Sequence, residues 1–220
     1  MAEAQLPTSR RLINALFTSI AAQTPTTRPA TSNTLKEVPP SIKSLLLTLH
    51  VLFPNEFLPA LDVLDRKLVI RIRLKDGAPT SDSDATAHDE EAIGSAGAMY
   101  LVRSAQQPSS HSSFINPQNT HYEVRPIAWN CSCPAFAFSA FPAPQDTHTE
   151  TTPPTLNSGN YEIESSIFGG LSLSEQGIPV CKHLLACVLA EQCPALFGEN
   201  VEARELSREE WAGWCAGWGG

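Results

Sequence analysis

Two short motifs of thiol and imidazole residues could together bind a metal ion. Cys131 and Cys133 flank Ser132, and Cys181 and His183 flank Lys182, with 47 residues between the two motifs. Three thiolates and one imidazole form a tetrahedral ligand set that suits Zn²⁺. Four protein ligands leave no position for water or substrate, so such a site is structural. The sequence therefore predicts a structural zinc site made of Cys131, Cys133, Cys181 and His183.

A simpler interpretation treats these residues as unrelated, with the cysteines buried as small apolar side chains. The Cys-x-Cys spacing is tighter than that of common zinc fingers and is weak evidence by itself. Cys187 lies one helical turn after His183 and could compete as a ligand, but we expect it to be a buried thiol. A Cys/His nucleophilic pair would need one of the four ligands, so no enzymatic activity is expected.

The elements next to the motifs predict how they are positioned. A strand at 120–129 is expected to run directly into Cys131, and a helix at about 179–192 begins at Pro179 and ends before Pro194. The first cysteine pair therefore lies at a strand end and the second pair at a helix start. The positive end of a helix favours thiolates, which makes this a suitable place for the site.

Hydrophobic periodicity predicts the remaining elements. Apolar residues at helical spacing indicate helices at 9–22, at 41 to Pro54 and at 57–65. Apolar residues in strand-like segments indicate strands at 68–74 and 99–103. The fold class is expected to be α+β, with N-terminal helices on a small antiparallel sheet, a zinc-clipped helix and long disordered insertions. The capping-box pattern from Ser207 to Glu210 predicts a last helix.

Composition narrows the possible functions. The 220-residue chain has a formal net charge of −8, which disfavours strong binding of a phosphate backbone by the chain alone. No apolar run is long enough to span a membrane, and the first residues lack the pattern of a secretory signal. An oxidised disulfide framework is therefore not expected, and the six cysteines are interpreted as thiols or metal ligands.

The domain organisation follows from the elements and from the Pro-, Ser- and acid-rich stretches between them. We expect an N-terminal helix and flexible linker at 1–40, followed by a helical pair with the first strand at 41–75. Acidic and Ser-rich insertions around a strand occupy 76–119. The zinc finger, with an insertion at 142–177, occupies 120–192, and a Trp-rich tail follows at 193–220.

The residues of both motifs resemble a known family. Cys131-Ser-Cys-Pro-Ala-Phe-Ala-Phe-Ser139 followed by Cys181-Lys-His-Leu-Leu-Ala186 is similar to the SWIM-type zinc finger. The closer resemblance is to the SWIM-domain subunit of Shu-type recombination complexes, supported by Leu52-Phe53 and Ala60 to Arg66. It covers roughly half of the chain. The 47-residue gap is longer than the family usually shows, and the tail from Cys193 has no counterpart.

The resemblance implies a non-enzymatic nuclear subunit that pairs with a RecA-like recombinase paralogue. Such a subunit promotes assembly of the recombinase filament on single-stranded DNA during homologous recombination repair. The ligands that the resemblance implies are the same four residues. The alternative is a stand-alone SWIM-type module that binds nucleic acid. A zinc hydrolase is a third possibility, but it would need an exchangeable water on the metal.

Three groups of residues allow two interpretations each. Arg71 and Arg73 form either a basic strip for DNA or an ordinary solvated strand face, which is the expected case. The aromatic residues after Cys133 form either a stacking platform or, as expected, a core beside the metal. The Trp residues of the last helix pack on the chain's own body or dock a partner. The two sets are Phe136, Phe138 and Phe141, and Trp211, Trp214 and Trp218.

Overall fold

The computed structural model describes residues 7–24, 38–75, 99–104, 121–142, 168–170 and 177–216. The acidic loop expected at 76–97, nearly all of the loop at 104–119, most of the insertion at 142–177 and Trp218 lie outside these residues. The division of the chain into five regions stays a prediction.

Three helices precede the sheet, as the periodicity predicted. They are α1 (Ser9–Gln23), α2 (Pro40–Leu52) and α3 (Phe57–Asp65). The Thr8 hydroxyl accepts a hydrogen bond from the Arg11 N–H at the start of α1, and Pro40 occupies the first turn of α2, where its missing N–H costs little. For α2 and α3 the buried residues belong to the periodic apolar set. For α1 the expected face of Leu12, Leu16 and Ile20 is wrong in part, because Leu12 is exposed and the buried residues are Ile13, Phe17 and Ile20.

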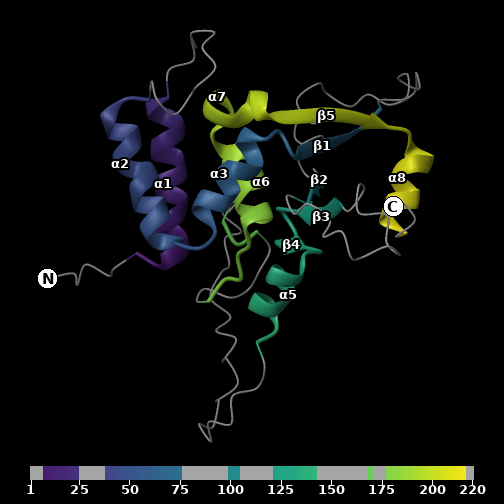
Figure 1. Ribbon diagram of the computed structural model, residues 1–220, viewed down its shortest axis with the longest axis horizontal. Coiled ribbons are helices and arrows are strands. Elements are labelled where there is room, and N and C mark those ends of the chain that lie inside the picture. The colour runs from purple at the N-terminus through teal and green to yellow at the C-terminus, as the bar shows by residue number, and fades with distance from the viewer. Residues whose placement is uncertain are drawn as a thin grey trace, which may run out of the picture.

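The five strands form one sheet in the order β4-β3-β2-β1-β5. Their bounds are Val69–Leu74 for β1, Met99–Arg103 for β2, His121–Arg125 for β3, Asn130–Cys131 for β4 and Val201–Leu206 for β5. The first four strands pair antiparallel, whereas β5 pairs parallel with β1 (Figure 1). The expectation of a purely antiparallel sheet is therefore wrong at one edge.

The strand expected at 120–129 ends earlier than predicted. β3 stops at Arg125, and a tight turn at 126–129 reverses the chain into β4, which pairs Val124 with Cys131. Pro126 explains the difference, because proline has no N–H to donate to a continuing ladder. Cys131 consequently lies on a separate short strand beside β3.

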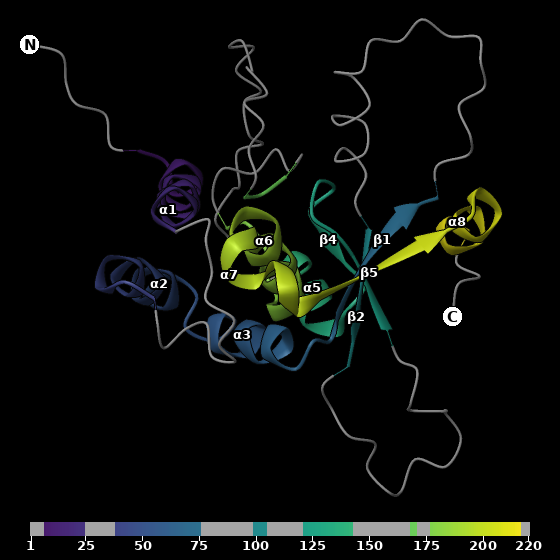
Figure 2. The ribbon, with the colours of Figure 1, turned by 90° about the horizontal axis from the view of Figure 1, so that it is seen from above.

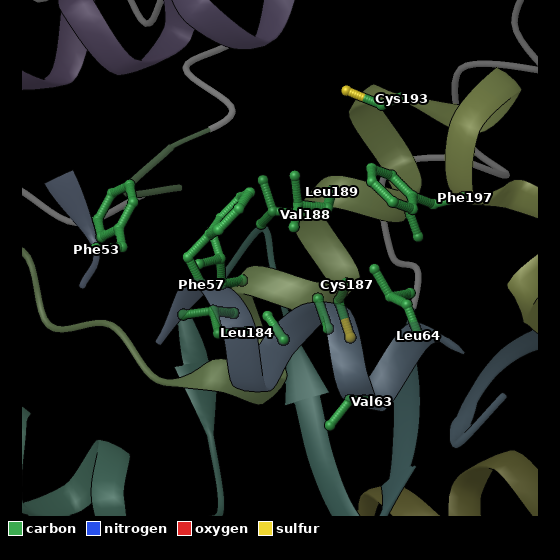
Figure 3. Packing of buried hydrophobic residues seen from close by; sticks show 14 of the residues in the cluster. Phe53, Phe57, Val63, Leu64, Leu184, Cys187, Val188, Leu189, Cys193 and Phe197 are labelled. Carbon is green, nitrogen blue, oxygen red and sulfur yellow. The ribbon is translucent and has the colours of Figure 1, made fainter. Parts of the chain in front are cut away.

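Helix α6 (Lys182–Gln192) is the centre of the molecule. Its residues 183–190 are all buried, and an apolar surface on every side is typical of a helix enclosed by other elements. α3 packs along α6, α1 and α2 lie farther out, and the sheet lies on the other side (Figures 1 and 2). Figure 3 shows the side chains of α3 and α6 that meet in this core.

The opposite face of the sheet has its own small core. Ile70, Ile72, Met99, Leu101 and Leu206 are buried there. Trp211 and Trp214 of α8 (Arg208–Cys215) pack against them, which confirms for these two residues that the Trp stripe covers the chain's own body. The capping box at Ser207 and Glu210 is present as predicted.

The sequence did not predict α5 (Pro134–Ala140), α7 (Pro194–Phe197), the 3-10 turn η2 (Gly198–Asn200) or strand β5. None of the described helices has the length and apolar character that crossing a membrane requires.

Candidate metal centre

The fold brings the four predicted residues together. Cys131 lies on β4, Cys133 precedes α5, Cys181 precedes α6, and His183 is in the first turn of α6. All four side chains are buried, and their ligand atoms lie within 4.8 Å of one another. The Cys131 Sγ is 3.9 Å from the His183 Nδ1. Two motifs far apart in the sequence therefore form one compact cluster that could hold a metal ion.

Two of the sulfur atoms also cap helices. The Phe136 N–H donates to the Cys133 Sγ over 3.3 Å, and the Leu184 N–H donates to the Cys181 Sγ over 3.4 Å. In each helix the sulfur occupies the N-cap position, where it satisfies a backbone donor that has no partner within the helix. The positive ends of both helices favour negative charge on sulfur. The backbone thus prepares the cluster for thiolates and for a cation between them.

The thiols differ in acidity because they share hydrogen bonds. Hydrogen bonds from Cys131 and Cys181 lower the pKa of Cys133. The pKa of Cys131 is raised, first by its hydrogen bond to Cys133 and further by burial. For Cys181, a hydrogen bond with Cys131 lowers the pKa, but the bond with Cys133 and burial raise it to about 11. Cys133 is therefore the thiol of the cluster that ionises most readily, whereas Cys131 and Cys181 hold their protons more strongly.

We expect metal binding near neutral pH to release about two protons, from Cys131 and Cys181. The apparent association constant for Zn²⁺ should rise up to about 100-fold per pH unit, because both protons must leave and the pKa of Cys181 is about 11. Calorimetric titration of the metal in two buffers with different ionisation enthalpies counts the protons. A release close to zero would contradict this charge distribution.

His183 completes the ligand set. Its Nδ1 faces the sulfur of Cys131, and its ring stacks at 4.7 Å from the Tyr122 ring. Its Nε2 is buried and has no hydrogen-bond partner among the described residues. Its contact with Cys131 makes Nδ1 the nitrogen best placed to bind a metal ion. The donor set, three sulfurs and one imidazole nitrogen, fits a tetrahedral metal ion.

A second contact joins the two halves of the site independently of any metal. The Trp129 Nε1 donates to the carbonyl oxygen of Pro179 over 2.8 Å, two residues before Cys181. The Trp129 ring meets the Phe168 ring edge-on, with 4.8 Å between the ring centroids. The centroid of the Phe168 ring lies 5.5 Å from that of Phe53, at the end of α2. Trp129 therefore connects the β3–β4 turn to the start of α6.

Residues 168–170, inside the range expected for the insertion, are anchored to α1 and to the β3–β4 turn. Arg10 of α1 donates to the carbonyls of Phe168 and Gly170, and the Asn14 side chain accepts from the Phe168 N–H. Gly170 has a φ of +48°, and a Cβ there would lie 2.2 Å from the carbonyl oxygen of Ile127. Only glycine fits so close to the β3–β4 turn. The segment before Cys181 is thus held by α1 and by this turn.

The aromatic residues after Cys133 differ from the prediction. Phe136 is buried in the core, but Phe138 and Phe141 are 78% and 81% exposed. The expectation that all three form a core is wrong for two of them. α5 is only seven residues long, and Phe136 is its one buried residue, so the other aromatic side chains extend into solvent.

The basic strip is also not uniform. Arg73 is exposed, but Arg71 is half-buried, with its guanidinium carbon 6.0 Å from the centroid of the Tyr100 ring. The Tyr100 hydroxyl donates a hydrogen bond to Glu191 over 2.8 Å. Burial raises the pKa of the Glu191 carboxyl, and this hydrogen bond and the charge of Arg71 oppose part of the rise. Arg71 therefore belongs to a partly buried polar group under the end of α6.

The other cysteines do not join the cluster. Cys187 and Cys193 are buried thiols, as predicted for Cys187, and burial raises the pKa of both, to about 12 for Cys193. Cys215 is exposed.

These features define an α+β domain with a closed, buried Cys₃His centre. The chain matches no family model, and no curated protein or solved structure is significantly similar to it.

Proposed function

We propose that the cluster is a structural Zn²⁺ site of the SWIM type. The observation that supports this most strongly is the burial of three sulfurs and one imidazole nitrogen within 4.8 Å of one another. Sulfur and imidazole ligands favour zinc over hard cations such as Mg²⁺ and Ca²⁺. The ion would join the β4–α5 segment to the start of α6, and thereby the sheet to the central helix.

The proposed site argues for a role without catalysis. Four protein ligands would fill a tetrahedral zinc ion, so no position remains where water could be activated. The N-terminal ends of α5 and α6 lie next to the sulfurs of Cys133 and Cys181, which cap these helices and belong to the cluster. Zn²⁺ here would supply folding free energy, and the protein would act through its surfaces.

We further propose that the protein is an accessory subunit that pairs with a RecA-like recombinase paralogue in the nucleus. In this role it promotes recombinase filament assembly on single-stranded DNA during homologous recombination repair. The support for this is the resemblance of the two metal motifs and of the segment Leu52 to Arg66 to the SWIM-domain subunit of Shu-type complexes.

The distribution of charge bears on contact with DNA. Thirteen of the 15 Lys and Arg residues lie in the described part of the chain, but only ten of the 23 Asp and Glu residues do. The excess acid therefore belongs to the segments outside the described residues. A folded body without excess acid is compatible with DNA binding in a complex in which a partner supplies the main phosphate contacts.

Co-expression with a set of RecA-like paralogues tests the pairing. We expect one of them to co-purify with the zinc-loaded chain in a defined ratio, and the complex to speed filament formation on single-stranded DNA. A RecA-fold ATPase from outside the recombinase family serves as the control. Failure of the folded, zinc-loaded chain to bind any of the paralogues would remove this function.

Phe138 and Phe141 favour a second candidate, a nucleic-acid-binding module that acts alone. Exposed aromatic rings stack with unpaired bases, and each stacked base contributes about 1–3 kcal/mol. If this candidate is correct, the Phe138→Ala/Phe141→Ala variant should bind single-stranded DNA at least about tenfold more weakly than the wild type. Leu58→Ala is the matched control, because Leu58 is also a large exposed apolar residue but lies on α3. Fluorescence anisotropy at low salt decides, and no binding by the wild-type chain would eliminate the candidate.

A further inference from the structure

Strand β5 forms one edge of the sheet. It is the last strand in the sheet order, beyond β1 (Figure 1), and Figure 2 views the molecule from this side. Residues 202–205 are exposed, and none of the described strands pairs with the outer side of β5. A six-residue edge strand whose outer N–H and C=O groups meet no described strand is a template for a further strand.

The hydrogen bonds to β1 show which backbone groups point outward. The carbonyl oxygen of Leu206 accepts from the Lys75 N–H over 2.8 Å, so the backbone groups of Leu206 face β1. Backbone groups of successive residues in a strand point to alternate sides. Arg204 and Glu202 therefore also face β1, and the N–H and C=O groups of Val201, Ala203 and Glu205 face outward.

This alternation restricts how a second copy of β5 could pair antiparallel with the first. Outward residues can pair only with outward residues, so the two-fold axis must pass through a residue. Centred on Ala203, the pairing uses all three outward residues of each copy: Val201 opposite Glu205 of the other copy, and Ala203 opposite its equivalent. A shift by two residues in either direction uses only two of them.

The same register is the one that matches the charges. With the axis at Ala203, Glu202 of each copy lies opposite Arg204 of the other, in non-hydrogen-bonded pairs where side chains approach most closely. The shifted registers place Glu202 opposite Glu202 or Arg204 opposite Arg204. Both side chains are exposed, and neither forms an ion pair within the described residues. Hydrogen bonding and charge therefore select the same pairing.

We propose that the protein self-associates through β5, forming one continuous sheet across two copies, with Glu202 and Arg204 as reciprocal cross-strand ion pairs. This surface is separate from the metal centre and does not depend on the proposed function.

Sedimentation of the full zinc-loaded chain over a range of concentrations tests the proposal. We expect a monomer–dimer equilibrium in the wild type. Glu202→Arg and Arg204→Glu each place like charges opposite one another at two positions, so each variant should dimerise about tenfold more weakly or worse. An equal mixture of the two variants should dimerise again, because every Arg then meets a Glu. The double exchange Glu202→Arg/Arg204→Glu should also recover the dimer.

Both positions are exposed, so the variants should keep their zinc content and thermal unfolding, which provides the folding control. A wild-type chain that stays monomeric at every concentration would overturn the proposal. Dimers that are unaffected by single charge reversal, or a mixture of the variants that stays monomeric, would overturn it as well. None of these results depends on whether a recombinase paralogue binds.

Discussion

Cys181→Ala should leave a chain that binds no zinc stoichiometrically and does not fold stably at 25 °C. A structural zinc ion contributes roughly 10 kcal/mol or more of folding free energy, which is comparable to the total stability of a typical domain, about 5–15 kcal/mol. The substitution also removes the N-cap acceptor for the Leu184 N–H at the start of the central helix. Circular dichroism during heating and zinc content after purification measure the effect.

Cys187→Ala is the matched control. Cys187 is a fully buried cysteine on the same helix, one turn beyond His183, and is not part of the cluster. Its replacement leaves a small cavity and should cost only about 1–2 kcal/mol, with one zinc ion retained. If Cys181→Ala unfolds at the same temperature as Cys187→Ala, the metal does not support the fold as proposed.

Trp129→Ala should be the most destabilising change outside the ligands, with a loss of about 3–5 kcal/mol. Trp129 is 4% exposed, contacts Phe168 and donates to the Pro179 carbonyl. Its φ of +50° lies in the left-handed region, which costs a residue with a side chain roughly 1–2 kcal/mol and persists because the surrounding packing fixes it. Urea unfolding measures the loss.

Zinc release shows whether Trp129 also holds the two halves of the site together. We expect faster transfer of zinc from the Ala variant to a chromogenic chelator, because Cys181 then loses its non-metal connection to the β3–β4 turn. Trp129→Phe keeps an aromatic ring but removes the N–H donor. The lost hydrogen bond should lower the free energy of unfolding by about 1 kcal/mol, in addition to the effect of the smaller ring. An Ala variant with unchanged stability would contradict this role.

Local patterns predicted the elements whose signals are contained in a short segment. The helices that begin at Ser9, Pro40 and Phe57 carry apolar residues at helical spacing, and Pro40 and Pro54 mark the two ends of α2. The four cluster residues were predictable because ligand chemistry restricts metal sites to a few residue types. The sequence could not show that the two motifs meet, and that depends on the whole fold.

The missed features depend on contacts between distant segments. β5 has charged residues on most of its exposed positions, so it lacks the alternation of a half-buried strand. It forms because its backbone pairs with β1, about 130 residues earlier in the chain. Phe168 lies in the range expected for an insertion, and only its contacts with Trp129 and Phe53 give it a role in the core. The exposure of Phe138 and Phe141 follows from the short length of α5, which the sequence did not predict.

X-ray absorption spectroscopy at the zinc edge, combined with elemental analysis of the freshly purified protein, tests the central claim most directly. The account predicts one zinc ion per folded chain, with three sulfur neighbours at about 2.3 Å and one nitrogen neighbour at about 2.0–2.1 Å. A folded chain that contains no metal, or a zinc ion with a water molecule in place of one of these ligands, would contradict it.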